Sequence, residues 1–289
     1  MRPESFESYL SRNHTPKTAR TYLHYVDHFL IQQPKASQLK YMDVAEYLSE
    51  TMVKGGAKLK QVNLLLASLK VYYNYLISIG KKVDNPCKAI KLKQKRKPIQ
   101  LQDLFNPSEL EALMNRENRF VNLEIRNKVI ISFLIYQALT SAEVEHLTTD
   151  DIDLDNGTIN IKGSKKQAGR LLDLRVNQIR LIQSYVETAR TNLLRVETNR
   201  LMISSRGTPD NVGSIHAMLS PLKNRYPDRT LNAITIRQSV ISNMLNLQKL
   251  PLETVQLFAG HKWPSSTEKY RRKDLEEQRA LINMFHPLK

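Results

Sequence analysis

The residues of this 289-residue chain that could carry chemistry lie near its C-terminal end, in the stretch 258–270. There His261 stands just past a predicted helix end, and Tyr270 follows it nine residues later. Arg271 and Arg272 come directly after the tyrosine. Because nearby cations stabilise a phenolate, Tyr270 is a candidate nucleophile towards a phosphodiester. The competing interpretation is that Tyr270 simply packs in a core, as most tyrosines at helical spacing do.

The charge of the chain indicates a polyanionic partner. Lysine and arginine total 44 against 28 aspartates and glutamates, which gives a net charge of +16 and a pI near 9.8. The excess is concentrated in residues 1–105, which hold 18 basic and 8 acidic side chains. We therefore expect nucleic acid as the partner, although a basic protein of this size can also be merely soluble.

Several classes of protein are excluded by composition. The single cysteine, Cys87, can form neither an internal disulfide nor a multi-cysteine zinc site. No stretch approaches the roughly 18 apolar residues that span a bilayer, and the first residues lack an apolar signal core. Phosphate-cradling glycine loops are missing as well. We expect a cytoplasmic protein with no membrane partner, no metal and no other cofactor.

The first part of the chain is predicted to form a four-helix bundle. Apolar residues recur at steps of three and four, and glycine or proline falls between the segments. The second helix begins at Thr15-Pro16, a capping residue followed by proline in the first turn. The other helices are expected at about Glu4–Arg12, Met42–Val53 and Ala57–Ile79.

A lysine-rich connector follows the bundle. Residues 81–97 contain eight basic side chains and one acid, Asp84, so they form either a solvated linker or a linker that tracks DNA. The predicted organisation is an N-terminal domain over 1–90, a basic linker over 91–106 and a second domain over 107–289.

The second domain is predicted to be helical around one β-hairpin. Alternating residues mark strands at 158–161 and 170–174, and a lysine-rich turn joins them. The fold class is therefore mainly α with a small antiparallel β-hairpin. Helices are expected from Asn106-Pro107-Ser108 onward and at about 123–138, 177–195, 212–225, 234–247, 251–259 and 274–284.

These motifs together resemble the tyrosine recombinase, or phage-integrase-like, family. The stretch 259–270 is similar to the family's Leu-Gly-His motif with its nucleophilic tyrosine nine residues on. Arg237 stands where the family has the second arginine of a His-x-Leu-Arg motif. Lys165 falls on the turn that carries the family's catalytic lysine, with Lys166 as the rival. The segment 139–144 is similar to the first-arginine motif, Leu-Arg-x-Ser-Glu-Leu.

Two positions depart from the family pattern. Thr140 stands in place of the first arginine, and Ile234 in place of the histidine before the second arginine. Losing one preorganised charge contact to the transition state costs roughly 3 to 4 kcal/mol unless another cation replaces it. Arg126 and Lys128 are candidates for that cation. Mobile-element recombinases of the Bacteroidetes type, which this chain resembles, also lack the first arginine.

The resemblance implies a role for each matched residue. Tyr270 would attack the scissile phosphate and form a 3′-phosphotyrosyl link, while Arg237 and His261 hold the phosphate oxygens and Lys165 protonates the leaving 5′-oxygen. A SAM-like core-binding domain and a catalytic domain would close as a clamp on double-stranded DNA. The implied protein is an integrase or transposase of a mobile element, associated with the nucleoid. It would work as a homotetramer on two DNA sites, and a host DNA-bending protein or a second recombinase stays open as a partner.

DNA contacts are expected from basic residues off the apolar stripes and in the linker. These residues are Lys17, Arg20, Lys58 and Lys60 in the bundle, and Lys95, Arg96 and Lys97 in the linker. The helix 274–284 either docks on a neighbouring protomer, as in the family, or packs on its own domain.

Two other functions compete with the recombinase. Thr140 and Ile234 leave open a catalytically lapsed relative that binds and bridges DNA. A type IB topoisomerase would share the phosphotyrosine chemistry, but the compact helical bundle and short length disfavour it. An enzyme would lose its activity on Tyr270→Phe, whereas a DNA-binding module would be unaffected by this substitution.

Overall fold

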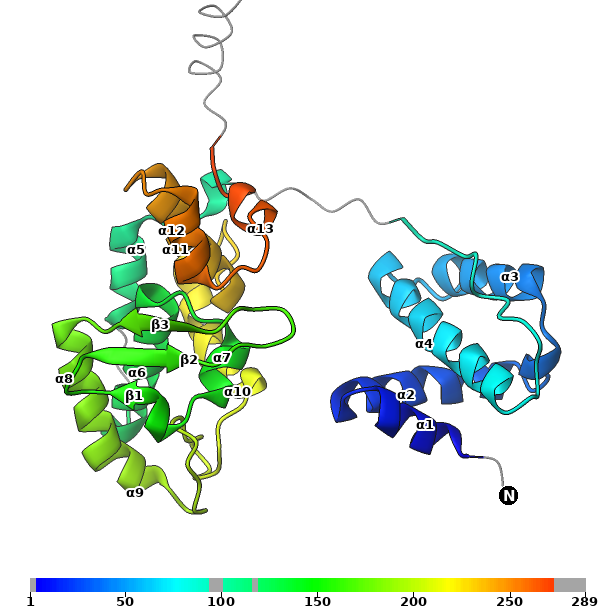
Figure 1. Cartoon of the computed structure of the whole chain (residues 1–289), viewed down its shortest axis with the longest axis horizontal. Helices are drawn as coiled ribbons and strands as arrows, with labels where there is room; N and C mark the ends of the chain where they lie inside the picture. The colour runs from blue at the N-terminus through cyan, green and yellow to red at the C-terminus, as the bar shows by residue number, and fades with distance from the viewer. Residues whose placement is uncertain (1–3, 94–100, 116–118, 273–289) are drawn as a thin grey trace, which may run out of the picture. The chain divides into compact units, whose positions relative to one another are not determined.

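The computed structural model describes residues 4–93, 101–115 and 119–272, and they divide between two compact units, residues 1–97 and 98–289 (Figure 1). The described elements are mainly helices with one three-stranded antiparallel sheet, which confirms the predicted fold class. The predicted DNA contacts Lys95, Arg96 and Lys97 lie outside the described residues, as does the predicted helix 274–284.

The N-terminal unit is a bundle of four helices, as predicted. Thr15 caps the second helix by accepting a hydrogen bond from the backbone N–H of Thr18, and Pro16 occupies its first turn. The Tyr73 hydroxyl is buried and donates to the Ala36 carbonyl at 2.9 Å. The helices are α1 (Phe6–Asn13), α2 (Pro16–Gln32), α3 (Tyr41–Val53) and α4 (Leu59–Ser78), with a 3₁₀ turn at Ala36–Gln38.

The C-terminal unit surrounds its central helix, α6 (Val121–Tyr136), with shorter elements. Before α6 come α5 (Pro107–Glu111) and the 3₁₀ turns Leu101–Asp103 and Ala112–Met114. After it come α7 (Ser141–His146), the 3₁₀ turn Thr149–Asp151, β1 (Ile152–Asp153), β2 (Thr158–Ile161) and β3 (Arg170–Asp173). The remaining elements are α8 (Val176–Ser184), the π-helical turn Tyr185–Arg190, α9 (Thr191–Leu193), α10 (Val212–Leu219), the 3₁₀ turn Ser220–Arg225, α11 (Ala233–Asn246), α12 (Leu252–Ala259) and α13 (Ser265–Glu268).

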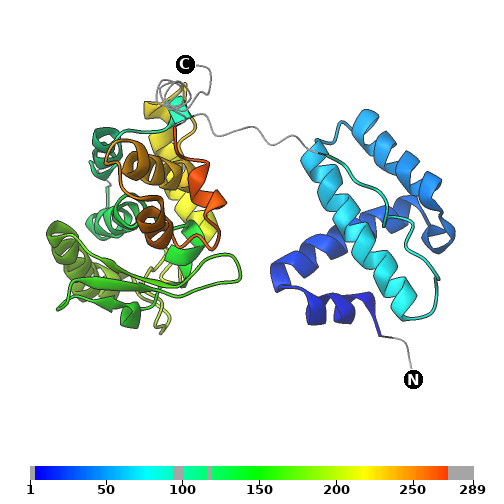
Figure 2. The same cartoon turned by 45° about the horizontal axis from the view of Figure 1, so that its top comes forward.

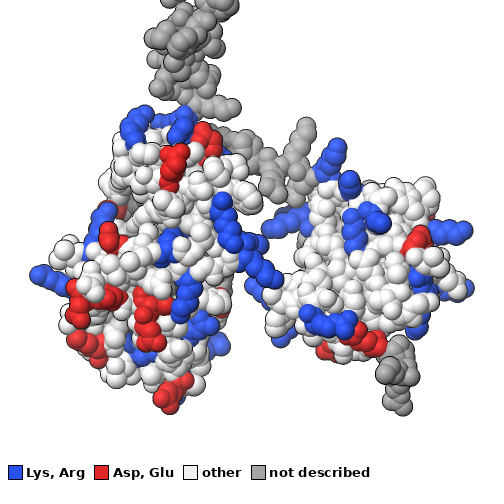
Figure 3. All heavy atoms as spheres, in the orientation of Figure 1, with Lys and Arg blue, Asp and Glu red and all other residues white. Residues whose placement is uncertain are grey.

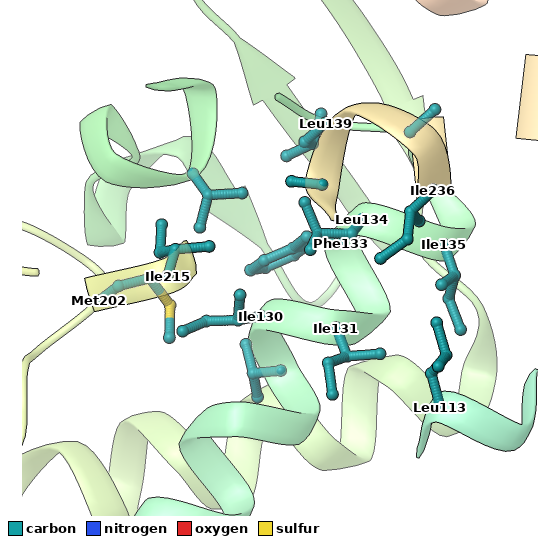
Figure 4. Close-up of a cluster of buried hydrophobic side chains, with 14 of the residues drawn as sticks. Leu113, Ile130, Ile131, Phe133, Leu134, Ile135, Leu139, Met202, Ile215 and Ile236 are labelled. Carbon is teal, nitrogen blue, oxygen red and sulfur yellow. The ribbon is translucent and has the colours of Figure 1, made fainter. Parts of the chain in front are cut away.

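Helix α6 forms the core of this unit because it is apolar around most of its circumference. Figure 4 shows Phe133 and Leu134 at the centre, between Ile215 of α10 and Ile236 of α11, and all four side chains are fully buried. Burying a side chain of this size contributes about 1.5 to 3 kcal/mol. The core therefore fixes α11, and with it the residue Arg237, relative to the rest of the unit.

The sheet has the order β1-β2-β3, and Ile161 pairs with Arg170 where β2 and β3 meet their connecting turn. Both cartoon views show this turn projecting from the body of the unit (Figures 1 and 2). Side chains alternate along β3, so Arg170 and Leu172 face inward while Leu171 is exposed.

Sequence periodicity located the long elements and missed the short ones. Strand β1 and helices α7 and α13 have two, six and four residues, too few to show a periodic pattern. The helix predicted at 177–195 is confirmed as one helical segment over residues 176–193, in which a π-helical turn joins α8 to α9. The helix predicted at 212–225 ends at Leu219 and continues as a 3₁₀ turn, because Pro221 has no backbone N–H to donate.

Candidate active site

Arg237 is a buried arginine on the second turn of α11. Its side chain is 8% exposed, and its guanidinium donates to the backbone carbonyls of Ala138 and Ala259. Nη2 also donates to the side-chain oxygen of Gln167 at 3.2 Å. Burial lowers the pKa of Arg237 to about 10, opposed by the negative charge of Glu143, so the group stays cationic at neutral pH.

His261 is placed by the end of α12. The helix stops at Gly260, whose backbone is left-handed with φ +65°. A Cβ there would lie 2.6 Å from Nη1 of Arg170 and 2.9 Å from the carbonyl oxygen of Ala168, so only glycine fits. His261 Nδ1 lies 2.9 Å from the hydroxyl of Thr267, which is fully buried on α13. Burial and the charge of Arg237 lower the pKa of His261 to about 4, so its ring is neutral at pH 7.

Tyr270 follows α13 and comes to the same place. Its ring stacks on that of His261, with centroids 6.3 Å apart and planes 14° apart. The residue is 5% exposed, and the ammonium of Lys269 lies 5.0 Å from its ring centroid. The Asn246 side chain donates to the Tyr270 carbonyl at 2.8 Å, which ties the segment to α11. Tyr270, His261 and Arg237, predicted from motif spacing, thus meet in one cluster.

Thr140 has a structural part in the same cluster. It caps α7: its hydroxyl oxygen accepts from the backbone N–H of Glu143 at 3.1 Å, and its own backbone N–H and hydroxyl donate to Glu143 Oε2 at 2.8 and 2.9 Å. Oε1 of Glu143 accepts from Arg170 at 2.7 Å, and Nη1 of Arg237 lies 4.0 Å from Oε2. Burial raises the pKa of Glu143, but the hydrogen bond and charge of Arg170, the backbone N–H of Thr140 and the charge of Arg237 together outweigh it, so the net shift is downward.

The other positions singled out by the motifs differ in their surroundings. Ile234, in place of the family's histidine, is 64% exposed on the first turn of α11. Arg126 forms a buried ion pair with Asp210, and Lys128 pairs with Glu124 at 2.7 Å. Both candidate replacement cations are thus engaged with other carboxylates.

The β2–β3 turn is attached to the His261 segment along one arm. Gln167 pairs with His261 as an antiparallel bridge, and the N–H of Ala168 donates to the Gly260 carbonyl at 2.9 Å. Lys165 and Lys166 are exposed at the tip of the turn. Lys166 lines a cavity of about 690 Å³ and Lys165 is not among its lining residues; the lining includes Thr140, Glu143, His146, Lys162 and Arg200.

Basic side chains are distributed differently on the two units. On the face shown in Figure 3, those of the C-terminal unit gather along the side from which the β2–β3 turn projects, whereas acidic side chains gather over the sheet. In the N-terminal unit the four predicted DNA contacts among the described residues are exposed: Lys17 and Arg20 on α2, and Lys58 and Lys60 at the start of α4.

The described part of the chain also bears on metal binding and on membrane insertion. Within it, no group of three or more histidine, cysteine, aspartate or glutamate side chains is arranged to hold a metal ion. None of the described helices combines the length and the apolar character that crossing a membrane requires.

Sequence reasoning missed four residues of the cluster: Glu143, Gln167, Arg170 and Thr267. Glu143 stands at the glutamate of the first-arginine motif, and one of the other three had a usable signal. Arg170 lies two residues before Leu172 in a predicted strand, so both side chains face the interior. A buried arginine needs a hydrogen-bond or charge partner, which the sequence could have indicated. Thr267 gave no such signal, because its contact with His261 depends on the path of a loop.

Comparison with known proteins identifies the family. The sequence pattern described as "Phage integrase family" matches residues 103–277, and that of the "Phage integrase, N-terminal SAM-like domain" matches residues 4–80. The chain therefore belongs to the phage integrase family of tyrosine recombinases. Among its relatives are the tyrosine recombinases XerD of Yersinia pestis and XerC of Lactobacillus delbrueckii subsp. bulgaricus. The first is 26% identical over 254 residues, covering 85% of this chain and 81% of the relative, and the second 27% identical over 305 residues, covering 99% of each.

Solved structures share the fold across both units. The XerH site-specific recombinase bound to its difH substrate aligns with a TM-score of 0.71 at 22% identity, covering 95% of this chain and 84% of that one. The Tn1549 transposon integrase in complex with circular intermediate DNA aligns with a TM-score of 0.70 at 15% identity, covering 96% and 97%. At these identities the likeness establishes the fold.

Proposed function

We propose that this protein is a site-specific DNA strand transferase that integrates or transposes a mobile element, of the Bacteroidetes type that lacks the first arginine. The observation that carries the proposal is the convergence of Tyr270, His261 and Arg237, from three separate segments, in one cluster of a phage integrase fold. A nucleophile, a cation and a neutral hydrogen-bonding ring are what a phosphodiester exchange requires.

The proposed reaction conserves the energy of the phosphodiester bond, because a phosphotyrosyl bond forms as the phosphodiester bond breaks. The phenolic oxygen of Tyr270 forms a bond to phosphorus as its proton leaves to water, and the bond from phosphorus to the 5′-oxygen breaks. Lys165 gives a proton to that oxygen, with Lys166 as the alternative donor. The planar guanidinium of Arg237 holds the non-bridging oxygens. Attack by a 5′-hydroxyl on the phosphotyrosine reverses the steps, so neither ATP nor a metal is consumed.

The neutral ring of His261 suits it to donate a hydrogen bond to the phosphate. If the Thr267 hydroxyl donates to Nδ1, the ring proton resides on Nε2, the nitrogen on the far side from Thr267. Thr267 would thereby select the tautomer, as an orienting group does for a catalytic histidine. The low pKa keeps this arrangement unchanged across the neutral range.

A covalent-trapping assay tests the proposal. DNA from the ends of the element is nicked next to the candidate cleavage site, so the released fragment diffuses away and the adduct accumulates. We expect a protease-sensitive adduct with the wild-type chain and with Tyr226→Phe, a matched change in the same unit, but not with Tyr270→Phe. An adduct that survives Tyr270→Phe contradicts the assignment of the nucleophile.

The broader organisation belongs to the same proposal. A domain over 1–90 and a catalytic domain over 107–289, joined by the basic linker 91–106, would close as a clamp on double-stranded DNA. Its phosphate contacts would include Lys17, Arg20, Lys58, Lys60, Lys95, Arg96 and Lys97. The working assembly would be a homotetramer on two DNA sites, with a host bending protein or a second recombinase where needed, in the nucleoid of the cytoplasm.

A second candidate function is a lapsed relative that binds and bridges DNA without cutting it. Thr140 favours it, because the side chain in place of the first arginine is engaged in capping α7. The exposed Ile234 favours it too. Tight binding to element ends without an adduct would support this function.

A further inference from the structure

Arg170 is a buried cation at the active site for which the motifs provide no role. It begins β3 and faces inward, and its side chain is 6% exposed. Nη1 donates to Glu143 at 2.7 Å, and the packing of Gly260 against the guanidinium leaves no room for a Cβ. The residue is therefore held from two sides within the cluster that contains Arg237.

The other edge of this guanidinium has no partner in the described part of the chain. Nε and Nη2 of Arg170 are both buried and find no hydrogen-bond acceptor among the residues that the structure describes. These two nitrogens form one edge of the group, and their N–H bonds run parallel, the geometry that binds two oxygens of a carboxylate or a phosphate. Proteins rarely leave charged donors buried and unsatisfied, so the edge is suited to an acceptor that comes from outside the chain.

The charges of the cluster also favour an anion. Glu143 is the one carboxylate shared by Arg170 and Arg237, at 2.7 and 4.0 Å. Two cations against one anion leave a net positive charge in a site with low solvent exposure. The neutral donors of Thr140 complete the shell of Glu143 but add no charge.

We propose that Arg170 is the second phosphate-binding arginine of this enzyme and supplies, from β3, the contact that position 140 lacks. The inference rests on the proposed strand-transfer function. Its Nε–Nη2 edge would bind a non-bridging oxygen of the scissile phosphate opposite Arg237, and Glu143 would hold both guanidinium groups in place.

The proposal includes a movement of the β2–β3 turn. The free edge of Arg170 is shielded from solvent in the DNA-free chain, so a phosphate reaches it only after the neighbouring backbone shifts. The β2–β3 turn is the segment suited to this shift, because it projects from the unit. A shift of the turn would also act on Gly260, since the backbone N–H of Ala168 donates to the Gly260 carbonyl. In this turn the side-chain oxygen of Gln167 accepts a hydrogen bond from Nη2 of Arg237, and a phosphate oxygen could replace it as the acceptor.

The test measures the rate of adduct formation by Arg170→Met and Arg170→Lys on nicked DNA. A second substrate carries a methylphosphonate at the scissile position, in which an uncharged methyl group replaces one charged oxygen. Arg175→Met is the matched control, since Arg175 lies in the same unit but pairs with the exposed side chain of Glu111. DNA binding and thermal unfolding are recorded for every variant.

We expect Arg170→Met to slow adduct formation on the phosphodiester by about 10²- to 10³-fold, with DNA binding little changed. On the methylphosphonate this deficit should shrink to about tenfold or less, because less charge then needs a partner. Arg170→Lys keeps a cation beside Glu143 and so protects the fold, but it should still be slowed tenfold or more, because an ammonium cannot present the same edge.

Each remaining outcome overturns the inference. Equal losses on both substrates, or full activity of Arg170→Lys, would mean that Arg170 only neutralises Glu143. A wild-type rate for Arg170→Met would remove Arg170 from the reaction while leaving the strand-transfer function intact. Absence of any adduct from the wild-type chain would instead overturn the proposed function, and the inference with it.

Discussion

The two units of this protein use charge in opposite ways. The first third of the chain has the larger excess of basic residues, yet none of the charged side chains described in the N-terminal unit is buried. The C-terminal unit buries Arg126, Asp151, Asp210 and Arg237. Exposed charges attract a polyanion over a distance and are screened by salt, whereas buried charges are fixed in place and weakly screened. The comparison separates a surface that can hold DNA from a site that can react with it.

The largest difference between the units should appear when a carboxylate is neutralised. Glu143→Gln leaves two buried arginines without their anion, so we expect the C-terminal unit to lose about 3 to 5 kcal/mol of unfolding free energy. Amide hydrogen exchange at increasing urea, followed in peptides from the central helix α6, reports this unit.

The matched change in the N-terminal unit is Glu50→Gln, which removes the exposed partner of Lys54. Amide hydrogen exchange in peptides from α4 should be unchanged by it. Equal and small effects of the two substitutions would contradict the view that Glu143 is the shared anion of a buried charge cluster.

Surface and buried cations should also differ in their response to salt. Replacing Lys17, Arg20, Lys58 and Lys60 together with glutamine should reduce the slope of log affinity for DNA against log salt by about 3 to 4, because each lost phosphate contact contributes about 0.9. Arg237→Gln should change that slope by about one at most. Titrations at several salt concentrations measure both, and an unchanged slope in the fourfold variant would remove these residues from the DNA interface.

The fold could be predicted from the sequence wherever a pattern repeats. The stripe of α4 and the alternation of β2 and β3 each extend over enough residues to mark a buried face. The residues Tyr270, His261 and Arg237 could be found because the resemblance gave their spacing. The contact between Glu143 and Arg170 could not, because it joins residues 27 positions apart through the path of a hairpin turn.

The role of Thr140 shows another limit of sequence reasoning. The motif showed only that position 140 lacks the family's arginine. What the threonine does depends on local geometry: it stands at the start of α7, three residues before Glu143, and caps that helix. A six-residue helix gives too little periodicity for its first residue to be recognised beforehand.

A smaller effect is expected from acid. The pKa of His261 is lowered from the ordinary 6.5 to about 4 in the folded chain, so the unfolded chain binds the proton more readily between these values. The contribution of His261 to stability is therefore complete above pH 6.5 and is lost progressively as the pH falls towards 4. Urea midpoints from amide hydrogen exchange in peptides from α6 should follow this course, and His261→Asn should flatten it. A midpoint that drops equally in the variant would assign the effect to other groups.

The smallest expected effect concerns two hydroxyl groups that make similar bonds in the two units. Thr267 meets the ring of His261 at 2.9 Å, and the Thr51 hydroxyl donates to the Tyr47 carbonyl at 2.8 Å. Each bond contributes about 1 kcal/mol, so Thr267→Val and Thr51→Val should destabilise their own units similarly. Only Thr267→Val should also slow adduct formation, by about tenfold, because it alone frees the ring that we propose binds the phosphate. Thr267→Ser, which keeps the hydroxyl, should restore the rate. A slow rate in both valine variants would show that general loss of stability, and not the orientation of His261, limits the reaction.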